Sequence, residues 1–265
     1  MMQPQPATRS VTAAEPHVAV RLQEVSLRYG PKIVLERCSL ECLTGQVTAV
    51  IGPSGAGKST ILRLVSGLRR PDAGHVFVDG EDITDSPERD LIEMRRQMGF
   101  AFQFAALFDS LTVAENVAFP LYEHTKLSKA EIDRKVIDTL SSLGLNDVES
   151  RLPAELSGGM QKRVGFARAI VNDPSIILFD EPTTGLDPIM THVITNTILD
   201  IQNRLHATSI VVTHDLPFVF AVADYIALLF EGSIIESGTG RDLRQSPNPL
   251  VQQFLQGSAL GPIPL

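Results

Sequence analysis

Hydrophobic and polar positions follow two periodicities along this chain of 265 residues, one typical of strands and one typical of helices. Apolar and polar residues alternate over 20–28 and 33–40, as they do in half-buried strands. Residues 59–66 instead have the spacing of a helix that ends near Gly67. Strands that alternate with helices predict an α/β fold, with a mostly parallel sheet covered by helices. Short apolar runs predict further strands at 46–51, 75–78, 98–102, 175–179, 208–212 and 225–230.

The stretch from about 101 to 165 has helical character and no convincing strand, which predicts a helical lobe inserted into the α/β core. Within it Ile132, Val136, Leu140 and Leu143 recur at helical spacing and are expected to pack inward.

The two ends of the chain suggest no membrane segment. Residues 1–17 have no apolar core and are expected to form a flexible tail, not a secretory signal. The apolar run at 219–230 contains Asp224 and is shorter than the roughly 20 residues that a membrane helix needs. Any membrane work is therefore expected from another chain.

Composition narrows the function classes. Hydrophobic residues make up 43% and charged residues 20% of the chain, which is ordinary globular composition. The net charge of −8 argues against non-specific nucleic-acid binding, which needs a basic surface. Cys38 and Cys42 are too few for a disulfide framework or a metal site, and we expect partly buried thiols in a reducing compartment.

The first chemical motif follows a predicted strand and precedes a predicted helix. Residues 52–60 read GPSGAGKST and satisfy G-x-x-x-x-G-K-[ST]. The glycines let backbone amides turn toward phosphate oxygens, and the helix adds its positive end. Lys58 is expected on the β and γ phosphates and the Ser59 hydroxyl on Mg²⁺. The predicted ATP-binding loop comprises Gly52, Pro53, Ser54, Gly55, Ala56, Gly57, Lys58, Ser59 and Thr60.

Acidic residues follow a second apolar run. The run at 176–179 ends in Asp180 and Glu181, where a carboxylate can hold Mg²⁺ and the next residue can face the γ-phosphate. We interpret Asp180 as the metal-side acid and Glu181 as the residue that polarises the attacking water. His214 follows another predicted strand and is a candidate γ-phosphate sensor.

A third motif, LSGGM at 156–160, places Ser157 as a helix N-cap and leaves the amides of Gly158 and Gly159 free for an anion. A kinase or GTPase with the same phosphate loop has no need of this second phosphate-facing helix start. With the other motifs, the order resembles that of ABC ATPases from end to end. Met160 departs from the commonest signature, which has glutamine there.

This resemblance implies a P-loop NTPase (RecA-like) α/β core with an N-terminal antiparallel β subdomain and an inserted helical subdomain. It implies an ATPase domain over 18–245 and a C-terminal extension over 246–265 that could contact another subunit. Tyr29 resembles the aromatic residue that stacks on adenine. Gln103 resembles the glutamine that ligates Mg²⁺ with Ser59 and Asp180 and acts in catalysis with Glu181 and His214. The loop expected at the dimer interface contains Gly185, Leu186 and Asp187.

The resemblance also implies a mechanism. Two copies face head to tail, and each ATP is held between one P-loop and the other copy's signature. Hydrolysis loosens the dimer and drives a membrane partner docked near Gln103. Phe104 and Phe108 are candidates for that contact.

Four segments resemble the ATPases of Mla-type (MlaF-like) lipid transporters: 104–128, 156–170, 180–188 and 253–264. That branch implies phospholipid transport between membranes that maintains outer-membrane lipid asymmetry, at the inner face of the inner membrane. The implied partners are an integral permease (MlaE-like) and an MCE-domain lipid-binding protein (MlaD-like), with a small STAS-type regulatory subunit left open. Ala105–Ala106, where Ser-Gly-Ala is common, leaves the branch slightly open. The alternatives are an ABC ATPase for organic solvents, amino acids or metals, and a non-transport ABC protein acting on ribosomes or DNA.

Overall fold

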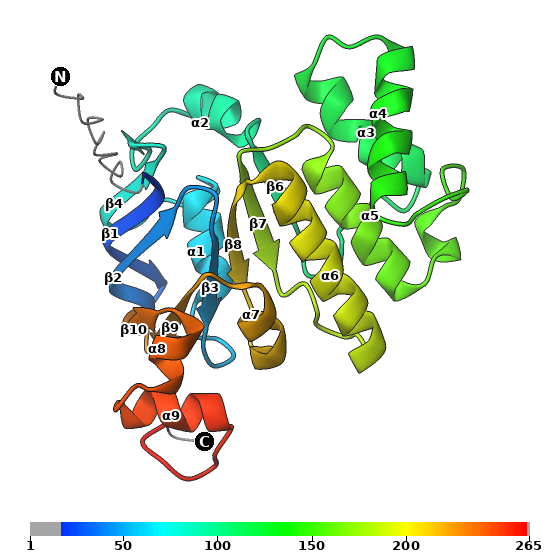
Figure 1. Cartoon of the computed structure of the whole chain (residues 1–265). Coiled ribbons are helices and arrows are strands. Elements are labelled where there is room, and N and C mark those ends of the chain that lie inside the picture. Colours follow the sequence, from blue (N-terminus) through cyan, green and yellow to red (C-terminus); the bar gives the residue numbers. More distant parts are fainter. Residues whose placement is uncertain (1–16, 264–265) are drawn as a thin grey trace, which may run out of the picture.

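An antiparallel sheet forms one side of the computed structural model, which describes residues 17–263 (Figure 1). β1 (Val18–Tyr29) pairs with β2 (Lys32–Leu43) on one edge and with β4 (Ala73–Val78) on the other, and the short β5 (Glu81–Asp82) extends the sheet. These bounds confirm the strands predicted from alternation. The tail expected over 1–17 lies outside the described residues except for His17.

A second, six-stranded sheet has the order β10-β9-β3-β8-β7-β6. Its strands from β9 to β6 are parallel, and β10 joins the edge antiparallel to β9. The sequence pattern did not predict β10. The strand bounds are β3 Val47–Ile51, β6 Met98–Ala101, β7 Ile176–Asp180, β8 Thr208–Val212, β9 Tyr225–Phe230 and β10 Ser233–Gly238.

Helices cover both faces of the parallel sheet (Figure 1). On one face, Ile61 and Leu64 of α1 belong to the same hydrophobic core as the antiparallel sheet. α1 therefore lies between the two sheets. The other face packs against α5, α6 and α7. The helix bounds are α1 Lys58–Val65, α2 Glu88–Arg95, α3 Val113–His124, α4 Lys129–Ser142, η1 Pro153–Glu155, α5 Gly158–Ile170, α6 Pro188–Leu205, α7 Leu216–Val222, α8 Gly240–Arg244 and α9 Pro249–Gln256.

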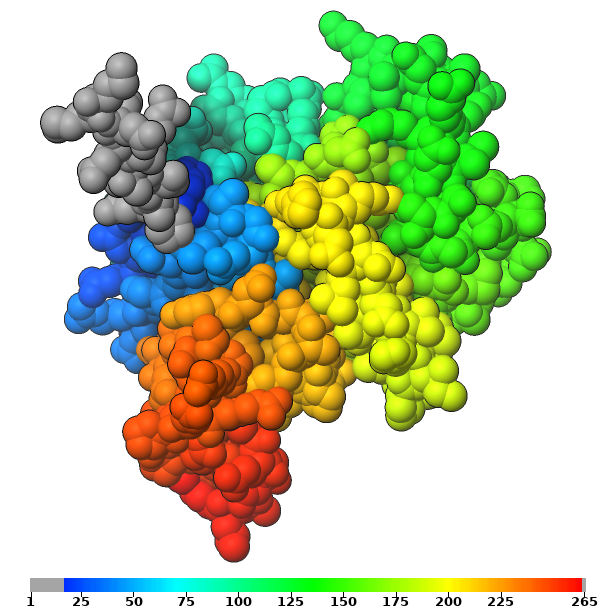
Figure 2. All heavy atoms as spheres, in the orientation of Figure 1, coloured from blue at the N-terminus to red at the C-terminus, as the bar shows by residue number. Residues whose placement is uncertain are grey.

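Helices α3, α4 and α5 form a helical lobe at the end of the molecule opposite the antiparallel sheet, drawn in green in Figures 1 and 2. Ile132, Val136, Leu140 and Leu143 are buried in its core, as their spacing predicted. α3 and α4 each begin with a capping box, in which the N-cap hydroxyl and a glutamate three residues on satisfy each other's backbone amides.

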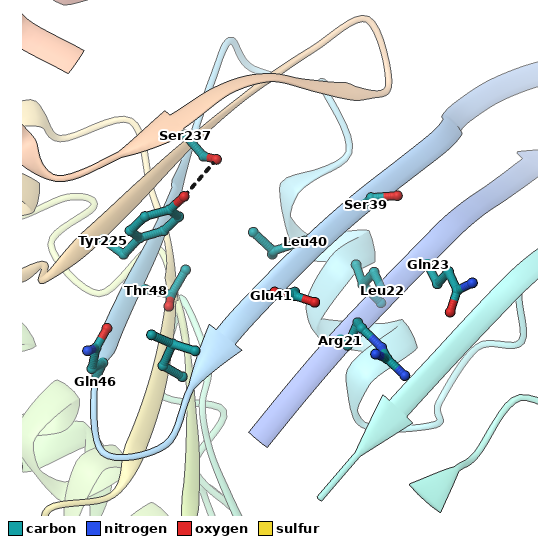
Figure 3. A pocket seen from close by; sticks show the side chains of 11 residues that line it. Arg21, Leu22, Gln23, Ser39, Leu40, Glu41, Gln46, Thr48, Tyr225 and Ser237 are labelled. Carbon is teal, nitrogen blue, oxygen red and sulfur yellow. Dashed lines mark hydrogen bonds between the residues drawn. The ribbon is translucent and has the colours of Figure 1, made fainter. Parts of the chain in front are cut away.

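A hollow of about 590 Å³ lies among side chains of β1, β2, β3, β9 and β10 (Figure 3). It borders Gln46 and Thr48 at the start of β3, and the Tyr225 and Ser237 hydroxyls lie 3.1 Å apart beside it. The glycine-rich loop follows the other end of β3. The hollow therefore lies near the amino end of β3, whereas the candidate nucleotide site lies at its carboxyl end.

Both cysteines lie inside β2, and both are fully buried where partial burial was expected. Burial disfavours the thiolate and raises the pKa of each thiol to about 12.

The C-terminal segment folds back onto α9. Gln253 is 5% exposed; its Oε1 accepts a hydrogen bond from the Ile263 amide and its Nε2 donates to the Ser258 carbonyl. Among residues 17–263, no helix is long and apolar enough to span a bilayer.

Candidate active site

The loop at 52–60, here called the P-loop, leaves the fully buried strand β3 and enters α1. Two of its glycines are required by close backbone approach. A Cβ on Gly52 would lie 2.1 Å from the Leu229 carbonyl oxygen, and one on Gly57 would lie 2.9 Å from the Val34 carbonyl oxygen. Gly57 also has φ +106, which disfavours L side chains. The motif glycines thus let the loop turn tightly between the two sheets.

Lys58 points back into this loop. Its Nζ donates to the Gly52 and Pro53 carbonyl oxygens at 2.9 and 3.0 Å and lies 3.9 Å from Glu181 Oε1. Burial lowers the pKa of Lys58, and the charges of Glu181 and Asp180 oppose that shift. The loop therefore holds a largely desolvated cation, at 7% exposure, where phosphate oxygens are expected.

Ser59 and Asp180 meet although they are far apart in sequence. The Ser59 hydroxyl donates to Asp180 Oδ1 at 2.8 Å, at the carboxyl end of β7. Hydroxyl and carboxylate oxygens are the hard donors that Mg²⁺ prefers, so this pair fits such an ion. Burial raises the pKa of Asp180, while the Ser59 hydrogen bond opposes the rise.

The raised pKa of Asp180 affects the thermal stability of the fold. Because the ionised carboxylate is disfavoured in the fold, Asp180→Asn is expected to raise the melting temperature at pH 7.5 by a few degrees in EDTA. The difference should shrink as the pH falls through the raised pKa, since Asp180 then becomes neutral as well. Calorimetry across pH 4–8 tests this. A melting temperature that falls at pH 7.5 would contradict it.

Glu181 is held by one side chain of its own loop and by two from the loop after β8. Its Oε2 accepts from the Thr184 and Thr213 hydroxyls, each at 3.1 Å, and His214 Nδ1 lies 3.1 and 2.9 Å from its two oxygens. Glu181 has φ 46, in the left-handed region, and its amide donates to the Val212 carbonyl oxygen. Such backbone strain is typical of residues whose side chain must be aimed. The sequence analysis did not predict that Thr184 and Thr213 would bind the Glu181 carboxylate.

Tyr29 and Gln103 are two further predicted site residues. Tyr29 is 40% exposed at the end of β1, with the Arg69 guanidinium 5.2 Å from its ring centre. Its strand partner β2 carries Val34, which touches Gly57. Gln103 is placed by its backbone, whose carbonyl oxygen accepts from Lys162. Within residues 17–263, no hydrogen bond joins the Gln103 side chain to Ser59 or Asp180.

The signature segment at 156–160 begins α5. The Ser157 hydroxyl accepts from the Met160 amide at 3.3 Å, as an N-cap does, and a Cβ on Gly158 would meet open space. In the described part of the chain, no hydrogen bond or ion pair joins Ser157, Gly158 or Gly159 to the P-loop.

The loop after Glu181 leads directly into α6. Asp187 caps α6 by accepting from the Met190 amide at 2.9 Å, Gly185 has φ +79, and Leu186 is partly buried against the core. Ile189, just beyond, is 77% exposed.

Comparison with known proteins gives these motifs a context. The sequence model of the ABC transporter family matches residues 35–184. The chain belongs to the ABC transporter family. It is an ATP-binding subunit with the ABC cassette fold, and its ATP hydrolysis is coupled to transport.

Two curated relatives and one solved structure show which members of the family this chain resembles. The chain is 40% identical to the intermembrane phospholipid transport system ATP-binding protein MlaF of Haemophilus influenzae, over 92% of each chain. It is 41% identical to the probable ribonucleotide transport ATP-binding protein mkl of Mycobacterium leprae, over 93% of this chain and 71% of that one. Among solved structures, a dimeric ATP-binding cassette with ADP and Pi is 32% identical with a TM-score of 0.76, over 83% of this chain and 98% of that one.

Proposed function

We propose that this ABC ATPase drives phospholipid transport between membranes. The observation that carries the proposal is the match to MlaF, which runs through 92% of both chains. The proposed partners are an integral MlaE-like permease and an MlaD-like MCE-domain protein, with the ATPase on the cytoplasmic face of the inner membrane. Another cargo is the second candidate, because the mkl relative named for ribonucleotide transport is equally similar over the part it shares.

Reconstitution tests the cargo. The ATPase, the permease and the MCE-domain protein are placed in donor liposomes, and transfer of fluorescent phospholipid to acceptor liposomes is followed with ATP and with ADP. ATP-dependent transfer supports the phospholipid proposal. If the same complex instead accumulates radiolabelled ribonucleotides and moves no lipid, the second candidate replaces it.

Nucleotide hydrolysis is proposed to need two copies, head to tail. In the described residues no hydrogen bond or ion pair joins the signature segment to its own P-loop, and a Cβ on Gly158 would meet open space. The dimeric solved relative supports this arrangement. Lys58 and the P-loop amides bind the phosphates, and Ser157, Gly158 and Gly159 of the second copy close over them. The Gly185–Asp187 loop is proposed to lie at the interface.

In the proposed chemistry Glu181 accepts a proton from the attacking water, and His214 fixes its carboxylate and senses the γ-phosphate. Ser59, Asp180 and Gln103 would hold Mg²⁺, which supplies positive charge against the phosphate oxygens. Tyr29 is proposed to stack on adenine. The hydroxyls of Thr184 and Thr213 keep the Glu181 carboxylate aimed into the site.

The proposed permease contact is an aromatic groove between the helical lobe and the Gln103 loop. It has a volume of about 310 Å³ and includes Phe108, whose ring lies 4.9 Å from that of Phe119 on α3. Phe104, in the same loop, is 80% exposed. Buried Asn116 braces the groove, since its side chain bonds both the amide and the carbonyl oxygen of Phe108. Exposed aromatic residues on a braced loop are typical of a protein contact.

Phe108→Asp is expected to reduce co-purification with the permease at least about tenfold, because it places a charge in an apolar contact. Ile137→Asp is the matched control, since Ile137 is a 52%-exposed apolar residue on α4 of the same lobe. Pull-down from detergent extracts measures both. Unchanged recovery of the Phe108→Asp variant would contradict this contact.

A further inference from the structure

A buried lysine lies two residues past the signature segment. Lys162 on α5 is 8% exposed, and its Nζ donates to the Gln103 carbonyl oxygen at 2.9 Å. Burial lowers the pKa of Lys162, and the opposing influence comes from the Glu181 carboxylate. Lys162 therefore contacts the Gln103 loop, and the charge of the candidate catalytic acid acts on it. No sequence motif indicated this contact.

A second basic residue of α5, Arg168, binds the part of the loop that follows Gln103. The Arg168 guanidinium donates to the Ala105 and Ala106 carbonyl oxygens. Both alanines have left-handed backbones, with φ 58 and 47, a conformation that non-glycine residues rarely adopt. The loop keeps this shape only where its surroundings determine it.

The same loop packs closely on α5. A Cβ on Gly165 would lie 3.0 Å from Ala105 Cβ, so the helix and loop meet with no intervening space. Lys162, Gly165 and Arg168 follow at intervals of three, which puts them on adjacent positions along α5. The loop at 103–106 is thus fastened along α5, the helix that Ser157 caps.

We propose that Lys162 is a positioning residue for ATP hydrolysis, which fastens the Gln103 carbonyl to α5 so that Gln103 and the signature segment shift as one unit. The hydrogen bond is charge-assisted and shielded from water, the setting in which such bonds are strongest. A displacement of the groove at Phe108 is then passed to Ser157 along α5. This inference rests on the proposed role of Gln103 in hydrolysis.

The test compares Lys162→Met with Lys162→Arg, which keeps a donor, and with Lys135→Met. Lys135 is the matched control because its Nζ also donates to a backbone carbonyl, that of Val171 at the C-cap of α5, and not to the Gln103 loop. Hydrogen exchange of the amides at 103–106 is measured without nucleotide, and kcat and KM for ATP are measured on the complex with the permease. Lys162→Met is expected to speed exchange about tenfold and lower kcat about tenfold, with KM within about twofold. Lys162→Arg and Lys135→Met should resemble the wild type.

Unchanged exchange and kcat in Lys162→Met would overturn the inference. It would also be overturned if Lys162→Arg were as impaired as Lys162→Met, because a cationic donor at this position would then not restore the function. Lys162→Leu repeats the test should Lys162→Met fold poorly. Gln103→Ala is run beside them: if it lowers kcat while Lys162→Met does not, the role of Gln103 stands and only the fastening by Lys162 fails.

Discussion

Glu181→Gln is expected to lower the rate of ATP hydrolysis by about 10²–10⁴-fold while ATP binding is retained. The substitution removes the proton acceptor but leaves an oxygen that can still accept from Thr184 and Thr213, so the local geometry should survive. ATP should then accumulate between two copies. Phosphate release and size-exclusion chromatography with Mg²⁺ and ATP measure the two effects.

Glu81→Gln serves as the control for this change, because Glu81 is exposed on β5 in the antiparallel sheet. It should hydrolyse ATP as the wild type does and show no ATP-dependent increase in dimer. Hydrolysis by Glu181→Gln at the wild-type rate would show that another group accepts the proton.

Lys58→Met is expected to weaken ATP binding about 10–100-fold, which is the loss typical of removing charge-assisted hydrogen bonds. The variant should fold normally, since burial of the Lys58 ammonium is already disfavoured in the nucleotide-free chain. Titration with a fluorescent ATP analogue measures the affinity. Exposed Lys126→Met is the control for loss of a positive charge.

Equal ATP affinity in Lys58→Met and wild type would contradict the phosphate-binding role of the P-loop lysine. A loss of affinity accompanied by a lowered melting temperature would instead indicate damage to the loop. Differential scanning fluorimetry without nucleotide separates the two.

The buried strands could be predicted because each is an apolar run bounded by turn residues. β8 and β9 have the predicted bounds to the residue. β10 could not be predicted in the same way, because it is an edge strand whose residues Ser233–Gly238 are mostly half-buried and mix polar with apolar types. Its place depends on pairing with β9, which a local pattern does not encode.

The site residues also divide into those that a local sequence pattern predicts and those whose contacts depend on the fold. Gly52 and Lys58 belong to a contiguous motif, whose spacing alone predicts a phosphate loop. The Thr213 hydroxyl that holds Glu181 comes from the loop after β8, and it meets Glu181 only because β7 and β8 pair with Asp180 opposite Val212. Lys162 contacts a carbonyl 59 residues away. Contacts of this kind depend on packing and could not be predicted from residue spacing.

The burial of Cys38 and Cys42 makes the chain a ready-made background for site-specific labelling. Thiol reagents act on the thiolate, and a pKa of about 12 leaves almost none at neutral pH. A cysteine introduced at an exposed position, such as Ile137 on the helical lobe, would therefore be the reactive thiol of the folded protein. Fluorophores attached there could report how the lobe moves during turnover, without removal of either native cysteine.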